Sequence, residues 1–110
     1  MKTIKIKFRF NLLSGMVLQT LVLHTKILFR EELDRLRKKE DHNIIEGEIE
    51  FETSASECVF SFTGSGDITT INTEGTYNFI YKNKNVYTED KSFKVNDFGR
   101  FGDVLTKVKL

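Results

Sequence analysis

The sequence of 110 residues contains no proline and no tryptophan, and it has one alanine and one cysteine. Without proline there is no cis-proline turn and no PxxP ligand, so Gly, Asn, Asp and Ser must form the turns. The single cysteine, Cys58, excludes an internal disulfide and argues against a cysteine-based zinc site. Low cysteine content fits a reducing compartment, and we therefore expect a cytoplasmic protein.

Signatures of catalysis, metal binding and phosphate binding are also missing. His24 and His42 lie far apart and show no known ligand spacing. Gly64-x-Gly66 lacks the third glycine of a dinucleotide motif. The kinase-like triplet Asp97-Phe98-Gly99 lacks its companion motifs. We therefore predict a protein that is not an enzyme, with no catalytic residues, no cofactor and no metal site.

Strand-forming residues dominate what is present. Val, Ile, Phe, Tyr and Thr together account for 40 of the 110 residues, whereas alanine, the best helix former, occurs once. Cys58, Phe60 and Phe62 share one face of an alternating run, so we expect the thiol to be a buried structural group. This composition predicts an α+β fold of mainly antiparallel sheet, folded as a single domain over residues 1–110.

The first 25 residues predict a β-hairpin. Apolar side chains alternate with cations from residue 3 to 12, a Ser-Gly turn follows at 14–15, and a second apolar run covers 16–24. This register pairs Phe8 with Leu21. A helix over the second run is the alternative, because a short apolar run fits both structures.

One amphipathic helix is predicted at about residues 27–41. Phe29, Leu33 and Leu36 recur at helical spacing, with acidic residues early and basic residues late in the segment. His42 would end this helix.

A β-meander is predicted after the helix. Ile45, Ile49 and Phe51 alternate with glutamates in its first strand, where Gly47 would mark a bulge. Further strands are expected at residues 58–62, 68–71, 76–82, 86–88, 92–95 and 104–110.

This order of elements, a hairpin, a helix and then further strands, resembles the opening of β-grasp domains, in which a sheet wraps one helix. The resemblance covers about the first half of the chain and rests on element order alone. A small, partly open barrel is the alternative architecture. Neither architecture implies a function, since such folds carry many unrelated ones.

The uncharged run from residue 10 to 25 could pass for a signal peptide, because cations precede it. However, the preceding segment alternates like a strand, and the small residues of a cleavage site are missing. The run is also shorter than the roughly 20 residues that a bilayer span needs. We therefore expect a soluble protein with no membrane partner.

Charge is strongly segmented along the chain although its formal net value is +1. Residues 1–39 carry a net charge of +7, residues 40–74 carry −9, and residues 75–110 carry +3. Within the acidic segment, alternate glutamates share one face of a predicted strand and a fifth follows just beyond a turn. We predict these as partner-binding residues: Glu46, Glu48, Glu50, Glu52 and Glu57.

Two interpretations of the acidic row stay open. Lys5, Lys7 and Arg9 could lie on a neighbouring strand and balance it, leaving a solvated face. Alternatively, the row binds a protein partner with a basic surface. The second interpretation predicts a small non-enzymatic protein-binding module, such as an inhibitor, an immunity-type protein or a phage-borne antagonist.

Three other interpretations remain. The basic first third of the chain could bind nucleic acid, and a phenylalanine-lined cavity could hold an apolar ligand. The segment Phe98-Gly99-Arg100-Phe101-Gly102 could stack on bases, or it could be a turn anchored by two core phenylalanines. A homodimer through the apolar second strand is also open.

Overall fold

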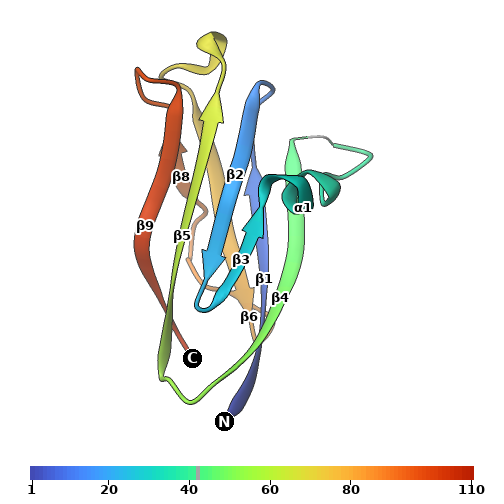
Figure 1. Ribbon diagram of the computed structural model, residues 1–110, viewed down its shortest axis with the longest axis vertical. Coiled ribbons are helices and arrows are strands. Elements are labelled where there is room, and N and C mark those ends of the chain that lie inside the picture. The colour runs from blue at the N-terminus through green and yellow to red at the C-terminus, as the bar shows by residue number, and fades with distance from the viewer. Residues whose placement is uncertain (42) are drawn as a thin grey trace.

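The computed structural model describes residues 1–41 and 43–110, and of residues 104–106 the backbone alone. Its strands form two antiparallel sheets that pack face to face, 45 × 28 × 25 Å overall (Figure 1). Sheet A has the order β4 (Ile44–Thr53), β1 (Lys2–Asn11), β6 (Glu74–Tyr81) and β7 (Lys84–Asn85), with β8 (Lys91–Lys94) also paired to β6. Sheet B has the order β3 (Lys26–Phe29), β2 (Met16–Leu23), β5 (Glu57–Gly66) and β9 (Arg100–Lys109).

Aromatic rings from both sheets fill the space between them. The ring centroids of Phe60 and Phe79 are 4.1 Å apart, and those of Phe10 and Phe62 are 5.0 Å apart, so each pair joins sheet B to sheet A. The hydroxyl group of Tyr77 donates a hydrogen bond of 2.5 Å to a carboxylate oxygen of Asp103. The aromatic contacts between the sheets add to the hydrophobic free energy gained by burial.

The predicted hairpin at the start of the chain is wrong. β1 pairs with β4 and β6, whereas β2 pairs with β3 and β5, so Phe8 and Leu21 lie in different sheets. Each of the two strands has one apolar face, and the connection between them crosses from one layer to the other. The two apolar faces therefore bury each other instead of sharing one side of a single sheet.

A β-bulge explains the pattern of β2. Its pairing with β5 shifts between Leu18 and Thr20, so that the inward positions change from even to odd numbers along the strand. Met16, Leu18, Leu21 and Leu23 are all buried as a result. The apolar run, whose pattern fits both a strand and a helix, is thus a strand with one extra residue.

The long predicted helix is also wrong. The helix α1 covers only Arg30–Arg35, with Leu33 as its buried residue, and it packs beside β2 and β3 (Figure 1). Ile27 and Phe29 pair instead with Val22 and Thr20 in a sheet. After the helix, the backbone N–H of Lys38 donates to the carbonyl of Ile44 at 3.0 Å. Sheet pairing on both sides therefore prevails over helical periodicity. His42, predicted to end the helix, lies outside the described residues.

The predicted meander holds only for the hairpin of β6 and β7. The chain crosses between the sheets from β4 to β5, from β5 to β6 and from β8 to β9. Residues 68–70 form a 3-10 helix (η1, Ile68–Thr70) and residues 86–88 form no strand, which corrects both predictions. Gly47 marks no bulge, since β1 and β4 pair without a shift. A Cβ there would lie 2.6 Å from Cζ of Phe8, so glycine lets that ring pack.

The predicted class is confirmed at the coarse level, as mainly antiparallel sheet with a little helix. The sheets do not close into a barrel, and nothing confirms a β-grasp arrangement. Within the described residues, no helix has the length and apolar character needed to cross a bilayer.

Candidate interaction surfaces

The predicted acidic row lies on the outer face of β4, the edge strand of sheet A. Ile45, Ile49 and Phe51 point inward and are buried. The register with β1 places a cation opposite three of the four glutamates. The opposed pairs are Lys5 with Glu50, Lys7 with Glu48, and Arg9 with Glu46, whereas Glu52 faces Thr3. The row therefore faces a basic row on the neighbouring strand.

Charged contacts across this face are mostly solvent-exposed. The shortest joins Nζ of Lys38 to a carboxylate oxygen of Glu46 at 3.2 Å. Nζ of Lys5 lies 3.9 Å from Glu50, and Nε of Arg9 lies 3.9 Å from Glu46. Exposed pairs of this kind contribute little to stability but balance the local field.

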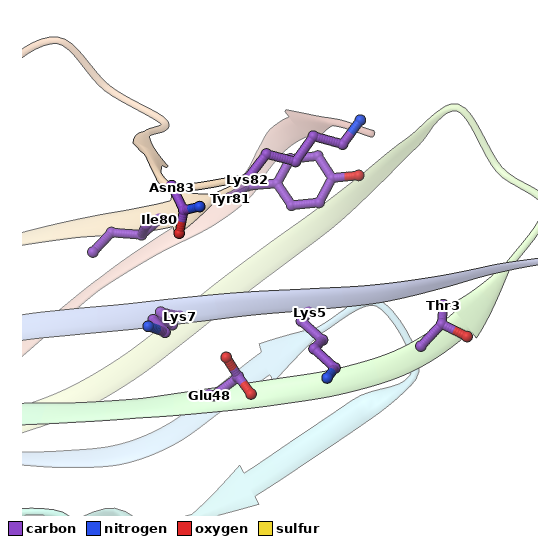
Figure 2. A pocket seen from close by; sticks show the side chains of 8 residues that line it. All are labelled: Thr3, Lys5, Lys7, Glu48, Ile80, Tyr81, Lys82 and Asn83. Carbon is purple, nitrogen blue, oxygen red and sulfur yellow. The ribbon is translucent and has the colours of Figure 1, made fainter.

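A shallow hollow of about 470 Å³ opens on this charged face. Figure 2 shows Lys5, Lys7 and Glu48 on one side of it and residues of β6 and its turn on the other. Nζ of Lys82 lies 5.3 Å from the ring centroid of Tyr81 at the same hollow. The lining mixes both signs of charge with apolar atoms, and it has no convergent set of catalytic groups.

Glu57, the fifth predicted residue, does not join the row. It begins β5 in sheet B, where its carboxylate lies 3.7 Å from Nζ of Lys107. The structure thus brings four of the five predicted glutamates together and places the fifth on the other sheet.

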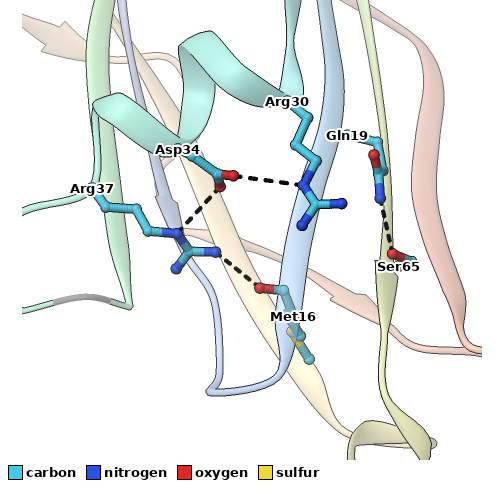
Figure 3. Close-up of polar contacts among 6 residues, drawn as sticks. All are labelled: Met16, Gln19, Arg30, Asp34, Arg37 and Ser65. Carbon is cyan, nitrogen blue, oxygen red and sulfur yellow. Dashed lines mark hydrogen bonds and ion pairs between the residues drawn. The ribbon is translucent and has the colours of Figure 1, made fainter.

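Basic residues after the first strand are also engaged by acids (Figure 3). Asp34 lies 3.5 Å from Nε of Arg30 and 3.5 Å from Nε of Arg37. Arg37 donates a further bond of 2.9 Å to the carbonyl of Met16, beyond the end of the β2–β3 pairing. The cations of the first third therefore serve the fold at these positions and do not form an uninterrupted basic surface.

The outer face of sheet B has a different character. The centre of this face is formed by residues of β3, β2 and β5 that carry no charge, and it is bordered by Glu57 of β5 and by Arg100 and Lys107 of β9. We call it the uncharged face, and it comprises Val17, Gln19, Thr20, Val22, Ile27, Phe29, Val59, Ser61, Thr63 and Ser65. Nε2 of Gln19 donates a 3.1 Å bond to Oγ of Ser65 within it (Figure 3), and the hydroxyls of Thr20 and Thr63 lie 2.7 Å apart.

Phe29 on this face occupies a position that suits another residue type. It is the N-cap of α1, where Ser, Thr, Asp or Asn would accept a backbone hydrogen bond. A phenyl ring cannot do so, and only the reciprocal bond from the Phe29 N–H to Glu32 exists, at 3.4 Å. The ring is nevertheless 57% exposed, and Ile27 beside it is 50% exposed.

Three loops meet at one end of the sandwich. We call this the loop end, and it comprises residues 12–15, 67–73 and 96–99, all at the top of Figure 1. The N–H of Asp67 donates to the carbonyl of Gly15 at 3.1 Å, and the N–H of Gly66 donates to the carbonyl of Gly99 at 2.8 Å. Backbone hydrogen bonds thus connect the middle loop to both others.

Two large apolar side chains project from the loop end. Ile68 is 85% exposed and Phe98 is 90% exposed, each directly after an exposed aspartate, Asp67 or Asp97. Both turns are hydrogen-bonded. Oδ1 of Asp67 accepts from the N–H of Thr69 at 3.0 Å, and Oδ1 of Asn96 accepts from the N–H groups of Phe98 and Arg100 at 3.0 Å each.

The segment Phe98–Gly102, considered above as a base-stacking turn, has one phenylalanine in the core and one in solvent. Phe101 is buried and stacks on Phe93 at 4.5 Å, so it is a core residue, whereas Phe98 is not. Sequence reasoning missed Ile68 and Phe98 as a pair. The Asn-Asp-Phe-Gly pattern at 96–99 was the available signal, because Asn and Gly favour a tight turn that leaves the residue between them outside.

Cys58 is buried in the core, and the ring of His24 packs against an aromatic side chain. Burial, with a smaller contribution from the charge of Glu57, raises the pKa of the Cys58 thiol to about 11. The imidazole of His24 stacks on Phe51 with centroids 5.0 Å apart. No group of three His, Cys, Asp or Glu side chains among the described residues is arranged to hold a metal ion.

Comparison of the chain with protein-family models, curated proteins and solved structures finds no match.

Proposed function

We propose that this protein is a small non-enzymatic protein-binding module, of the inhibitor, immunity or phage-antagonist type, that docks on a larger protein through its loop end. One observation carries the proposal: Ile68 and Phe98 are almost fully exposed at the same end of a rigid sandwich. Loops held by a scaffold are where binding residues concentrate, and large apolar side chains are typical interface anchors.

The hydrogen bonds of the two turns matter for affinity. Asp67 and Asn96 fix the backbone that carries each anchor before any partner arrives. Binding therefore loses little conformational entropy at these positions. Transfer of a Phe or Ile side chain from water into an apolar pocket contributes about 1.5–3 kcal/mol, which is roughly one to two orders of magnitude in affinity for each anchor.

Charge around the anchors favours one class of partner. Asp67 and Asp97 precede the two anchors and are exposed, while Arg100 is the single cation in residues 96–100. Phosphates of nucleic acid or of an anionic bilayer would be repelled beside these carboxylates. An apolar pocket with a basic rim on a protein fits them, in keeping with the basic partner surface expected from the sequence.

The acidic row remains a prediction as a second contact. Glu46, Glu48, Glu50 and Glu52 would speed association with a basic partner, but the opposing cations of β1 reduce the field that the row projects. Replacing the four glutamates by glutamine tests this contribution. Unchanged affinity and unchanged salt dependence would remove the row from the binding surface.

The test compares the tagged wild-type chain with an Ile68→Ser/Phe98→Ser double variant as bait in a lysate of the source cells. Lys84→Ser, an exposed change in the β6–β7 hairpin, is the matched control. A captured protein is then purified, and its affinity for each chain is measured by calorimetry. We expect the double variant to bind at least tenfold more weakly and the control to match wild type. Equal affinity for both variants would contradict the proposal.

A further inference from the structure

The free edge of β4 differs from the other sheet edges of the fold. Edge strands of natural sheets are usually short, bulged or rich in lysine, because these features prevent pairing with another chain. β3, β7 and β8 have four residues or fewer, whereas β9 has a register shift in its pairing with β5 and carries exposed lysines. β4 has ten residues, with no lysine, no proline and no shift in its pairing with β1. It therefore keeps a regular edge that is able to pair with a further strand.

The backbone groups that point to this edge belong to the glutamates. In an antiparallel sheet, the N–H and C=O of one residue point to the same side, and successive residues alternate between sides. The carbonyl of Ile44 accepts from the N–H of Lys38, on the side of β4 away from β1. The even-numbered residues of β4 thus direct their backbone groups to the free edge. Beyond the bridge at residues 37 and 45, these are Glu48, Glu50 and Glu52, all exposed.

The charge of these glutamates is balanced only in part. Among the described residues, ion pairs reach Glu46 and Glu50 but neither Glu48 nor Glu52. The cations of β1 lie on one flank of the row, and beyond the bridge no described strand pairs with β4 on the other flank. Carboxylates and backbone groups are therefore both available to a ligand along residues 48–52.

The apolar interior is also incompletely closed beside β4. β3 and β4 are the edge strands on one side of the sandwich, whereas β8 and β9 contact each other on the opposite side (Figure 1). Leu28 of β3 packs against the core but is only half-buried, and Ile49 and Phe51 of β4 lie on the inward side. Apolar side chains of an added strand would extend this inward layer.

We propose that the edge of β4 at residues 48–52 accepts an extended segment of another protein as an additional antiparallel strand. The segment carries lysine or arginine opposite the glutamates and apolar residues at the positions between them. β1 already pairs with the opposite flank of β4 in this way, since Lys5 and Lys7 face glutamates while Ile4 and Ile6 are buried. A second copy of β4 is excluded by charge, because a two-fold axis would place glutamate opposite glutamate.

A labelled nine-residue peptide of alternating lysine and valine, titrated with the purified full chain at low salt, tests the proposal by fluorescence anisotropy. We expect saturable binding, and about tenfold weaker binding of a peptide with the same residues in two blocks. In an antiparallel pair the lysine backbone groups face β4, so N-methylation of the lysines should weaken binding at least tenfold. N-methylation of the valines should change it less than threefold.

Variants of the chain test the charge. Glu48→Gln/Glu52→Gln should weaken binding of the alternating peptide about tenfold at low salt, and high salt should remove most of the difference. Glu31→Gln/Glu89→Gln removes the same charge at exposed positions outside β4, and as the matched control it should change binding less than twofold.

The edge of β4 is separate from the loop end, because Glu52 pairs with Thr3, at the far end of β1 from the loop at 12–15. The double variant of the two loop-end anchors should therefore bind the peptide as wild type does, whatever becomes of docking through the loops. Failure of the alternating peptide to bind would overturn the proposal. So would equal binding of the alternating and block peptides, or an equal effect of the two glutamine pairs.

Discussion

Gly64→Ala should strongly destabilise the fold, and the reason lies in how β9 packs on β5. Gly64 pairs directly with Phe101, whose ring lies over the glycine. A Cβ at Gly64 would lie 2.1 Å from Cζ of Phe101 and 2.5 Å from the carbonyl oxygen of Val17. Ordinary carbon contacts are about 3.5–4.0 Å, so the new methyl group must displace these atoms by more than about 1 Å.

Neither neighbour can move freely. The Phe101 ring is stacked on Phe93 of the opposite sheet, with centroids 4.5 Å apart, so it cannot retreat into the core. The Val17 carbonyl belongs to β2, which is paired to β5 at this point. Overpacking of this kind costs about 1–3 kcal/mol, and we place Gly64→Ala at the upper end, near 3 kcal/mol. For a chain of this size, that lowers the melting midpoint by roughly 13 °C.

The assay is thermal and urea unfolding followed by circular dichroism. Ser61→Ala, an outward position on the same strand, is the control and should shift the midpoint by no more than about 2 °C. In a double-mutant cycle with Phe101→Leu, removal of the ring should recover about half of the loss, because the Val17 carbonyl still clashes. A Gly64→Ala variant as stable as the control would refute the packing of β9 described above.

Three further changes test other parts of the structure. Arg37→Ala should cost about 1–3 kcal/mol in urea unfolding, since the Met16 carbonyl loses its 2.9 Å donor and Asp34 loses a cation; a neutral effect would show that water replaces the side chain at once. Cys58 should react slowly with a thiol reagent at pH 8 in the folded state and rapidly in urea, because burial keeps its pKa near 11. The unfolded thiol ionises near pH 9 while the folded thiol stays protonated, so stability should fall as pH rises from 9 to 11, by about 1.4 kcal/mol per pH unit, and a Cys58→Ala variant should lose that part of the slope. Lys5→Glu, opposite Glu50, should destabilise by less than about 1 kcal/mol, and 1 M salt should reduce the effect; a loss independent of salt would mean that the contact is not electrostatic.

Some features of the fold were predictable from the sequence because they depend on neighbouring residues alone. The alternation in β1 and β4 gave both strands with their inward and outward faces, and the same alternation gave a buried Cys58. The cations of β1 were also weighed as partners of the glutamates, and the register places them there. An alternation of apolar and polar residues over eight or more positions predicts a strand that tertiary contacts leave unchanged.

Features that depend on distant contacts were not predictable. The bulge at residues 18–20 disguises β2, because an extra residue shifts which side chains face inward. The sequence around α1 predicts one long helix, yet Ile27 and Phe29 pair with residues of β2, and Arg37 forms a β-bridge with Ile45 of β4. No local pattern shows that the chain crosses between layers after β1, since a turn of the same composition can close a hairpin.

The proposed binding site was missed for a related reason. Ile68 was expected in a strand and Phe98 in a turn with two core phenylalanines, and both expectations assume that an apolar residue is buried. The structure exposes both side chains at one end through turns that hydrogen bonds hold. The glutamates, in contrast, were easy to find because a charge pattern is visible in the sequence itself.

The most direct test of the proposed function is hydrogen–deuterium exchange of the full chain, measured by mass spectrometry with and without the captured partner. Docking through the loop end predicts slower exchange in residues 12–15, 67–73 and 96–99, whether or not β4 is protected as well. Protection along β4 and β1 with no change in the three loops would contradict the account and would assign binding to the glutamate row.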